Sequence, residues 1–240
     1  MRALLVALLV AAAPAAACET DGGAAHIAAH DGRLTLTLDD GMTVRLAALV
    51  PARDAAAAAP AIELSTLLGE PVSVRRSGPD DRWGRQVGDL LLARTGERLS
   101  HRLLTQGLAL VDPAGMPSDC LDARFSAEAV AETRRVGVWA TGFVADAADP
   151  RLAQQAGRFA LVDGVVDSVG ETKGTVYLNF GKAYRTDFTG LFSKRGGKEL
   201  AKTLKGLAGK RVRVRGVLGA WQGGFIRVTH RRQIEVRSAD

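Results

Sequence analysis

Four arginines near the end of the chain have the spacing of a polyanion-binding surface. Arg211, Arg213 and Arg215 alternate with valines in KRVRVRGVL, and Arg227 follows in FIRV. Because alternate residues of a strand share a face, this pattern predicts buried valines and one outward stripe of arginines. Guanidinium groups bind phosphate oxygens in pairs, so the expected chemistry of this stripe is the binding of nucleic acid.

The positive charge is concentrated in the same part of the chain. The 240 residues carry a net charge of +6. Residues 1–180 contain 17 Lys+Arg and 22 Asp+Glu, whereas residues 181–240 contain 15 Lys+Arg and 4 Asp+Glu. This shift predicts a domain boundary and a polyanionic partner, either nucleic acid or an anionic surface. A basic face that only keeps the protein soluble is the alternative.

Metal and nucleotide chemistry have little support in the sequence. His26 and His30 are four residues apart, which suits a metal ion on a helix, but no third ligand lies nearby. The sequence contains no Gly-x-Ser-x-Gly motif and no glycine-rich phosphate loop after a strand. We therefore predict no metal site and no cofactor from these patterns.

The first 17 residues read as a signal peptide, with one arginine, a short apolar run and Ala-x-Ala at the end. We expect an exported protein, periplasmic or secreted, without a transmembrane span. Cys18 would begin the mature chain. It either carries a lipid anchor or forms a disulfide with Cys120, because an oxidising compartment favours pairing of an even number of cysteines.

The order of strands and helices predicts the fold class, which is mainly β with helices (α+β). A hairpin at 32–50 precedes a helix, two strands and further helices up to residue 140, and a linker follows at 141–157. In residues 158–240, three strands, a helix and closing strands follow the order of an OB barrel. The chain is therefore expected to form two OB-like barrels, at 31–140 and 158–240.

Residues 31–140 resemble the thermonuclease, or staphylococcal-nuclease-like, family. The resemblance is carried by TVRLAALV, by the turn DDRWGR, by LLTQGLALV and by the helix end RRVGVWA, in that order. It implies a nuclease-like OB barrel, Ca²⁺ as the cofactor, and two arginines that bind the phosphate under attack. Those arginines match Arg45 and Arg85, and their forked donors suit the charge that builds at phosphorus.

The three acids that this family uses are replaced. Arg33, Val50 and Arg53 stand at the positions that the resemblance assigns to carboxylates. Because Ca²⁺ needs several oxygen ligands, we expect a barrel that holds phosphate without cutting it. The leading hypothesis is a nucleic-acid- or polyanion-binding protein. A metal-dependent endonuclease with other ligands and an envelope module that binds another protein are the alternatives.

Residues 158–240 resemble the small OB-like domain that follows thermonuclease-like domains in some exported bacterial proteins, with YLNFG as the recognisable segment. OB barrels bind single strands by combining a basic groove with aromatic platforms. The same aromatic residues also suit a barrel core, and the sequence leaves both roles open. The candidates are Tyr177, Phe180, Tyr184, Phe188, Trp221 and Phe225.

Overall fold

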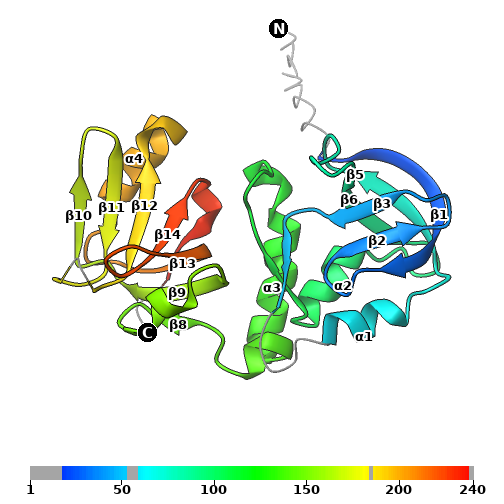
Figure 1. Ribbon diagram of the computed structural model, residues 1–240, viewed down its shortest axis with the longest axis horizontal. Coiled ribbons are helices and arrows are strands. Elements are labelled where there is room, and N and C mark those ends of the chain that lie inside the picture. The colour runs from blue at the N-terminus through cyan, green and yellow to red at the C-terminus, as the bar shows by residue number, and fades with distance from the viewer. Residues whose placement is uncertain (1–17, 53–58, 184–185, 238–240) are drawn as a thin grey trace, which may run out of the picture.

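The computed structural model of the chain describes residues 18–52, 59–183 and 186–237. The predicted signal peptide and Arg53 lie outside the described residues. Two β-sheets lie at opposite ends of the long axis, and helix α3 (Asp122–Arg134) lies between them (Figure 1). Within the described part of the chain, no helix is long and apolar enough to cross a membrane.

The first sheet is a closed five-stranded barrel in the order β1-β2-β3-β6-β5. Only β3 and β6 run parallel, and the other neighbours are antiparallel. This order is that of an OB barrel. The elements of this half are β1 (Thr20–His30), β2 (Thr35–Leu38), β3 (Thr43–Leu46), β4 (Leu49–Pro51), α1 (Ala59–Ser65), β5 (Pro71–Arg76), β6 (Gln86–Leu92), α2 (Leu99–Thr105), β7 (Ala109–Val111) and α3, with 3₁₀ turns at Ser118–Cys120 and Gly137–Ala140.

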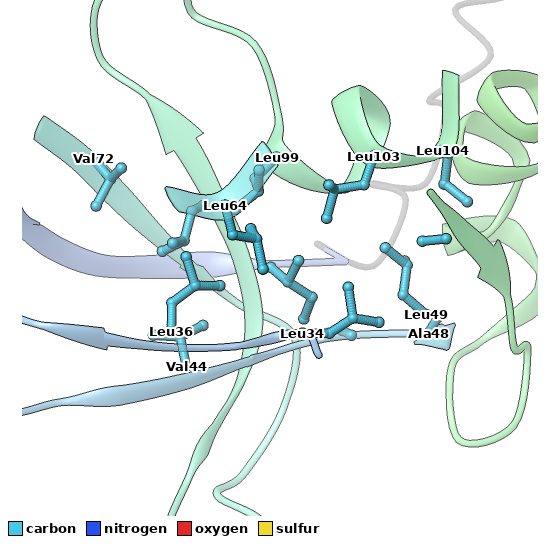
Figure 2. Close-up of a cluster of buried hydrophobic side chains, with 14 of the residues drawn as sticks. Leu34, Leu36, Val44, Ala48, Leu49, Leu64, Val72, Leu99, Leu103 and Leu104 are labelled. Carbon is cyan, nitrogen blue, oxygen red and sulfur yellow. The ribbon is translucent and has the colours of Figure 1, made fainter. Parts of the chain in front are cut away.

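The barrel core follows from the alternation of apolar and polar residues along its strands. In β2 and β3, Leu36 and Val44 point inward and are fully buried. Leu64 of α1 and Leu99 of α2 pack against these strands from the helices (Figure 2). The predicted hairpin and both helices are therefore present, and one continuous apolar cluster holds them together.

The first strand of the barrel, β1, is one that the sequence pattern does not predict. The predicted barrel begins at residue 31, but β1 pairs with β2 through its second half and with β5 through its first half. His26 and His30 therefore lie on a strand. His26 Nδ1 lies 2.9 Å from Asp39 Oδ2, and His30 Nε2 lies 2.9 Å from Ser65 Oγ.

The second sheet curls in the order β10-β11-β12-β14-β13-β9-β8, with β12 and β14 parallel. Only two residues separate β9 from β10, so these two act as one bent first strand and give an OB-like order. The elements of this half are β8 (Ala145–Asp146), β9 (Phe159–Val165), β10 (Ser168–Glu171), β11 (Thr175–Asn179), β12 (Thr189–Ser193), α4 (Lys198–Lys205), β13 (Arg211–Ala220), β14 (Gly224–Val228) and β15 (Ile234–Val236), with 3₁₀ turns at Leu152–Gln155, Lys194–Gly196 and Arg231–Gln233. The chain is thus mainly β with helices, in two OB-like units.

The segment expected to be a linker, 141–157, is packed onto the second sheet. Strand β8 pairs in parallel with β9, and Ala147 and Leu152 are buried in the second core. A third apolar cluster joins the two halves, because Leu161 of β9 packs with Leu110 and Trp139 of the first half. The two units therefore share a packed interface.

Candidate nucleic-acid interface

The two arginines expected to bind phosphate lie on one outward face of the first barrel. Arg45 of β3 is opposite Thr35 of β2 and opposite Val87 of β6. Arg85 lies two residues before Val87, so it shares this face. Arg85 Nη1 donates a hydrogen bond to Thr35 Oγ1 (3.3 Å), which brings both arginines next to the same threonine.

Asp81 fixes the position of Arg85. Its Oδ2 accepts from Arg85 Nε (2.8 Å) and lies 2.7 Å from Arg85 Nη2, while its Oδ1 accepts from the backbone N–H groups of Trp83 and Arg85. The hydrogen bond from Arg85 is the largest cause that lowers the pKa of Asp81 below its ordinary value. The carboxylate therefore orders the turn and holds the guanidinium in place.

Trp83 adds an exposed aromatic ring to this face. The side chain is 65% exposed, and the guanidinium carbons of Arg82 and Arg85 lie 3.9 and 4.8 Å from its ring centre. Sequence reasoning used Trp83 only as part of the turn motif. Trp83 lies in a tight Asp-x-Trp-Gly-Arg turn at the surface, where a large ring stays exposed. This position in a turn is the signal that could have identified it.

The carboxylate nearest to Arg33 in the sequence, that of Asp31, is used by the backbone of the hairpin. Arg33 is exposed, and the neighbouring Asp31 accepts from the backbone N–H groups of Arg33 (2.7 Å), Leu34 (3.1 Å) and Thr35 (3.0 Å). Burial by itself would raise the pKa of Asp31, but these backbone donors hold it below its ordinary value. Asp31 thus shapes the start of the hairpin.

Val50 is packed toward the second unit. It is half-buried and packs against the third apolar cluster, which contains Leu110, Trp139 and Leu161 of β9. An acid at this position would face an apolar interface. Across the described ranges, no three residues among His, Cys, Asp and Glu come together as a metal site.

Asp112 is an acid near Arg45 that the sequence reasoning missed. It follows β7 directly, and its Oδ1 accepts from the backbone N–H of Ala114 (3.1 Å). Burial raises the pKa of Asp112, and the positive charges of Arg45, Arg215 and His230 oppose that rise. One half-buried carboxylate beside an arginine can offset charge, but it does not make a metal site.

Two of the four predicted nucleic-acid-binding arginines are buried, which corrects the expected stripe. Arg213 is 3% exposed and Arg215 is 1% exposed. Arg213 pairs with Asp163 (2.8 Å) and with Glu132 of α3 (2.9 Å). The alternation of β13 does separate its arginines from its valines, but α3 covers the arginine face at Arg213 and Arg215. Arg213 and Arg215 therefore do not form the exposed stripe that the alternation predicts.

Arg215 is the deepest of these side chains. It lies 2.8 Å from Glu128 of α3 and donates to the backbone carbonyl of Val111 (3.0 Å). Arg211 and Arg227 are exposed, so both are available to a ligand in solution. The predicted stripe is thereby divided into two inter-unit contacts and two surface cations.

The two cysteines are joined. Cys18 and Cys120 form a disulfide with their Cα atoms 5.5 Å apart, which ties the start of β1 to the turn before α3. The thiol that a lipid anchor would use is therefore bound to Cys120 in this structure.

Fold and site together define a protein of two OB-like units, with an arginine- and tryptophan-bearing face on the first. Comparison of the sequence with family models and with curated proteins gives no match. The function is therefore argued from the site itself.

Proposed function

We propose that the protein binds single-stranded nucleic acid or a similar polyanion on the first barrel and does not cleave it. The binding surface, called the Trp83 face below, consists of Arg33, Thr35, Arg45, Arg82, Trp83 and Arg85. The observation that carries the proposal is that Arg45 and Arg85 share one outward face beside Trp83, an exposed ring flanked by two guanidinium groups.

The chemistry of the Trp83 face suits a single strand. Arginine forks hold phosphate oxygens, and an exposed ring stacks on any base, with roughly 1–3 kcal/mol per base. The motif resemblance to thermonucleases supports the same surface, since it assigns phosphate binding to Arg45 and Arg85. Loss of the family's acids at Arg33 and Val50 favours retention of the strand without hydrolysis.

Fluorescence anisotropy of a labelled oligothymidine with the full chain tests binding. We expect Arg85→Ala and Trp83→Ala each to weaken binding by about 10-fold, which corresponds to roughly 1.4 kcal/mol. Arg151→Ala is the matched control, because Arg151 is exposed and, among the residues that the structure describes, its side chain pairs with Asp149 of its own turn. Equal binding by the wild type, Arg85→Ala and Trp83→Ala would show that the Trp83 face is not the site.

Salt dependence gives a second measure of the same contact. If about three phosphates are engaged, log affinity against log salt should fall with a slope of roughly −2, at about 0.7 per phosphate of a single strand. Arg85→Ala should make this slope shallower, whereas Arg151→Ala should leave it unchanged.

Incubation of the purified protein with DNA or RNA and millimolar Ca²⁺ tests the absence of cleavage. We expect the nucleic acid to stay intact. Ca²⁺-dependent cleavage that survives repurification and is lost in Arg85→Ala would instead support the endonuclease hypothesis.

A further inference from the structure

A small pocket opens on the second unit, in the opposite half of the molecule from the Trp83 face. It has a volume of about 170 Å³ and lies between β11, β12 and the turn that joins β13 to β14. The side chains that give the pocket its chemistry are Tyr177, Asn179, Asp187, Trp221, Gln222 and Phe225.

Strand register brings these side chains together. Asn179 of β11 is opposite Thr189 of β12, and Thr189 is in turn opposite Phe225 of β14. Tyr177 lies two residues before Asn179 and therefore on the same face. The pocket thus occupies the outer face of the second and third strands of an OB-like order, which is a face that OB folds use for oligonucleotides and oligosaccharides.

The aromatic part of the pocket is held in place by the backbone. The ring of Phe225 lies directly over Gly219, where an added Cβ would come within 2.3 Å of Phe225 Cζ. Trp221 is 66% exposed, and its backbone N–H donates to Gly223 O (3.0 Å) across the turn. The ring of Phe225 is therefore packed on the hairpin backbone, and the ring of Trp221 projects from its turn.

The polar part of the pocket is also ordered. Asp187 Oδ2 accepts from the backbone N–H of Ala183 (2.6 Å), and Asn179 Nδ2 donates to Ser168 Oγ (3.2 Å). A carboxylate has about four acceptor positions, so Asp187 can still accept from a ligand. Asn179 and Gln222 add carboxamide groups, which both donate and accept.

The charge of the lining distinguishes this pocket from the Trp83 face. Among the lining residues that the structure describes, none is Lys, Arg or His, and Asp187 supplies the charge. A phosphate beside Asp187 would be repelled. A neutral ring with several hydroxyl groups fits better, because its C–H face packs on an aromatic ring while its hydroxyls meet Asp187 and the carboxamides.

We propose that this pocket binds one neutral sugar ring of an oligosaccharide. Its volume lies below the roughly 300–1,000 Å³ of pockets for drug-sized ligands, so one ring enters and the rest of the chain lies along exposed Trp221. This site is independent of the polyanion binding proposed for the first barrel.

Calorimetric titration of the full chain tests the proposal with three probes, namely cellotetraose, maltotetraose and the tetramer of N-acetylglucosamine. We expect at least one to bind, and Trp221→Ala and Gln222→Ala to weaken that binding by 10-fold or more. Both side chains are exposed, so neither variant endangers folding. Trp83→Ala is the matched control and should bind the sugar as the wild type does.

Failure of all three tetrasaccharides to bind would overturn the sugar assignment. So would binding that Trp221→Ala leaves unchanged. A fourth titration, with the tetranucleotide of thymidine, separates the two ligand classes. Nucleotide binding that is lost in Trp221→Ala but kept in Trp83→Ala would assign the pocket to a nucleobase and overturn the proposal.

Discussion

At the residue scale, the role of an arginine depends on the acid that pairs with it and on whether the pair is exposed or buried. Arg85 is held by Asp81 at the surface, where its guanidinium also meets Trp83 and Thr35. Arg215 is held by Glu128 in the interior, where no ligand reaches it. The same residue type therefore forms a candidate binding group in one place and a structural contact in the other.

Asp112 predicts a pH dependence of stability. Its pKa is raised by burial above the ordinary value of 3.8, so the folded protein keeps a proton that the unfolded chain has lost. The free energy of unfolding should therefore fall as pH rises from about 4 through the raised pKa. Asp112→Asn keeps an acceptor for Ala114 N–H and removes this fall, so the variant should gain stability relative to wild type between pH 4 and pH 7.

Urea unfolding at pH 4 and pH 7 measures the Asp112 effect. Asp146→Asn is the matched control, because exposed Asp146 also accepts from a backbone N–H two residues later. The change between pH 4 and pH 7 in the stability difference from wild type should be larger for Asp112→Asn than for this control. An equal offset for Asp112→Asn at the two pH values would contradict the prediction.

At the element scale, the two glycines that follow α2 and α3 lie against each other. Gly107 and Gly137 both have positive φ (67° and 57°), and Val138 N donates to Gly107 O (3.0 Å). An added Cβ on Gly137 would lie 2.4 Å from the carbonyl oxygens of Gln106 and Gly107. Two chain segments that the sequence showed as separate motifs therefore form one backbone crossing.

Gly137→Ala should be more destabilising than an ordinary glycine substitution. Positive φ alone costs alanine about 1–2 kcal/mol, and the backbone contact adds to that, so we expect a loss of about 3 kcal/mol or more. Gly142→Ala is the control, since Gly142 has φ 69° but open space around a Cβ. Similar losses for both variants in urea unfolding would show that the crossing adds no strain.

The disulfide between Cys18 and Cys120 joins two elements that are 102 residues apart in sequence. A loop of this length predicts stabilisation of about 4–5 kcal/mol by the chain-entropy account. Guanidinium unfolding with and without reductant should show a loss of this size. The double variant Cys18→Ala/Cys120→Ala should unfold alike under both conditions. Free thiols or acyl chains in the intact mass of the non-reduced exported protein would contradict the pairing.

At the scale of the whole molecule, α3 joins the two units. Its Glu128 and Glu132 pair with Arg215 and Arg213 of β13, and Arg232 pairs with Asp122. The apolar cluster around Trp139 and Leu161 lies in the same interface. The first barrel and the second sheet are thereby held as one packed body rather than as two barrels on a loose linker.

Arg215→Ala should weaken this interface strongly, because it leaves the carboxylate of Glu128 buried without its partner. Breaking a buried pair in this way costs about 3–5 kcal/mol. Arg211→Ala, which removes an exposed arginine from the same strand, should change stability by less than about 0.5 kcal/mol. Denaturant unfolding compares the two, and equal effects would show that the Arg215 pair contributes nothing.

Local patterns in the sequence determined most of the elements. Apolar alternation predicted the 32–50 hairpin and the strand that contains Arg211, Arg213 and Arg215. Apolar spacing predicted the helices that contain Leu64, Leu103 and Leu204. These features depend on neighbours a few residues away, so periodicity is sufficient to locate them. Strand β1 was missed because its Gly/Ala-rich residues bury little except Ile27, and its partners lie far along the chain.

Only the tertiary structure decided which faces meet solvent. Alternation separated the arginines of β13 from its valines, but α3 covers the arginine face and turns Arg213 and Arg215 into buried pairs. In the same way, Val50 packs toward the second unit, and Asp112 lies near Arg45 only because β7 ends there. The physical reason is that strand periodicity fixes which residues share a face, whereas the packing of distant elements fixes what lies against that face.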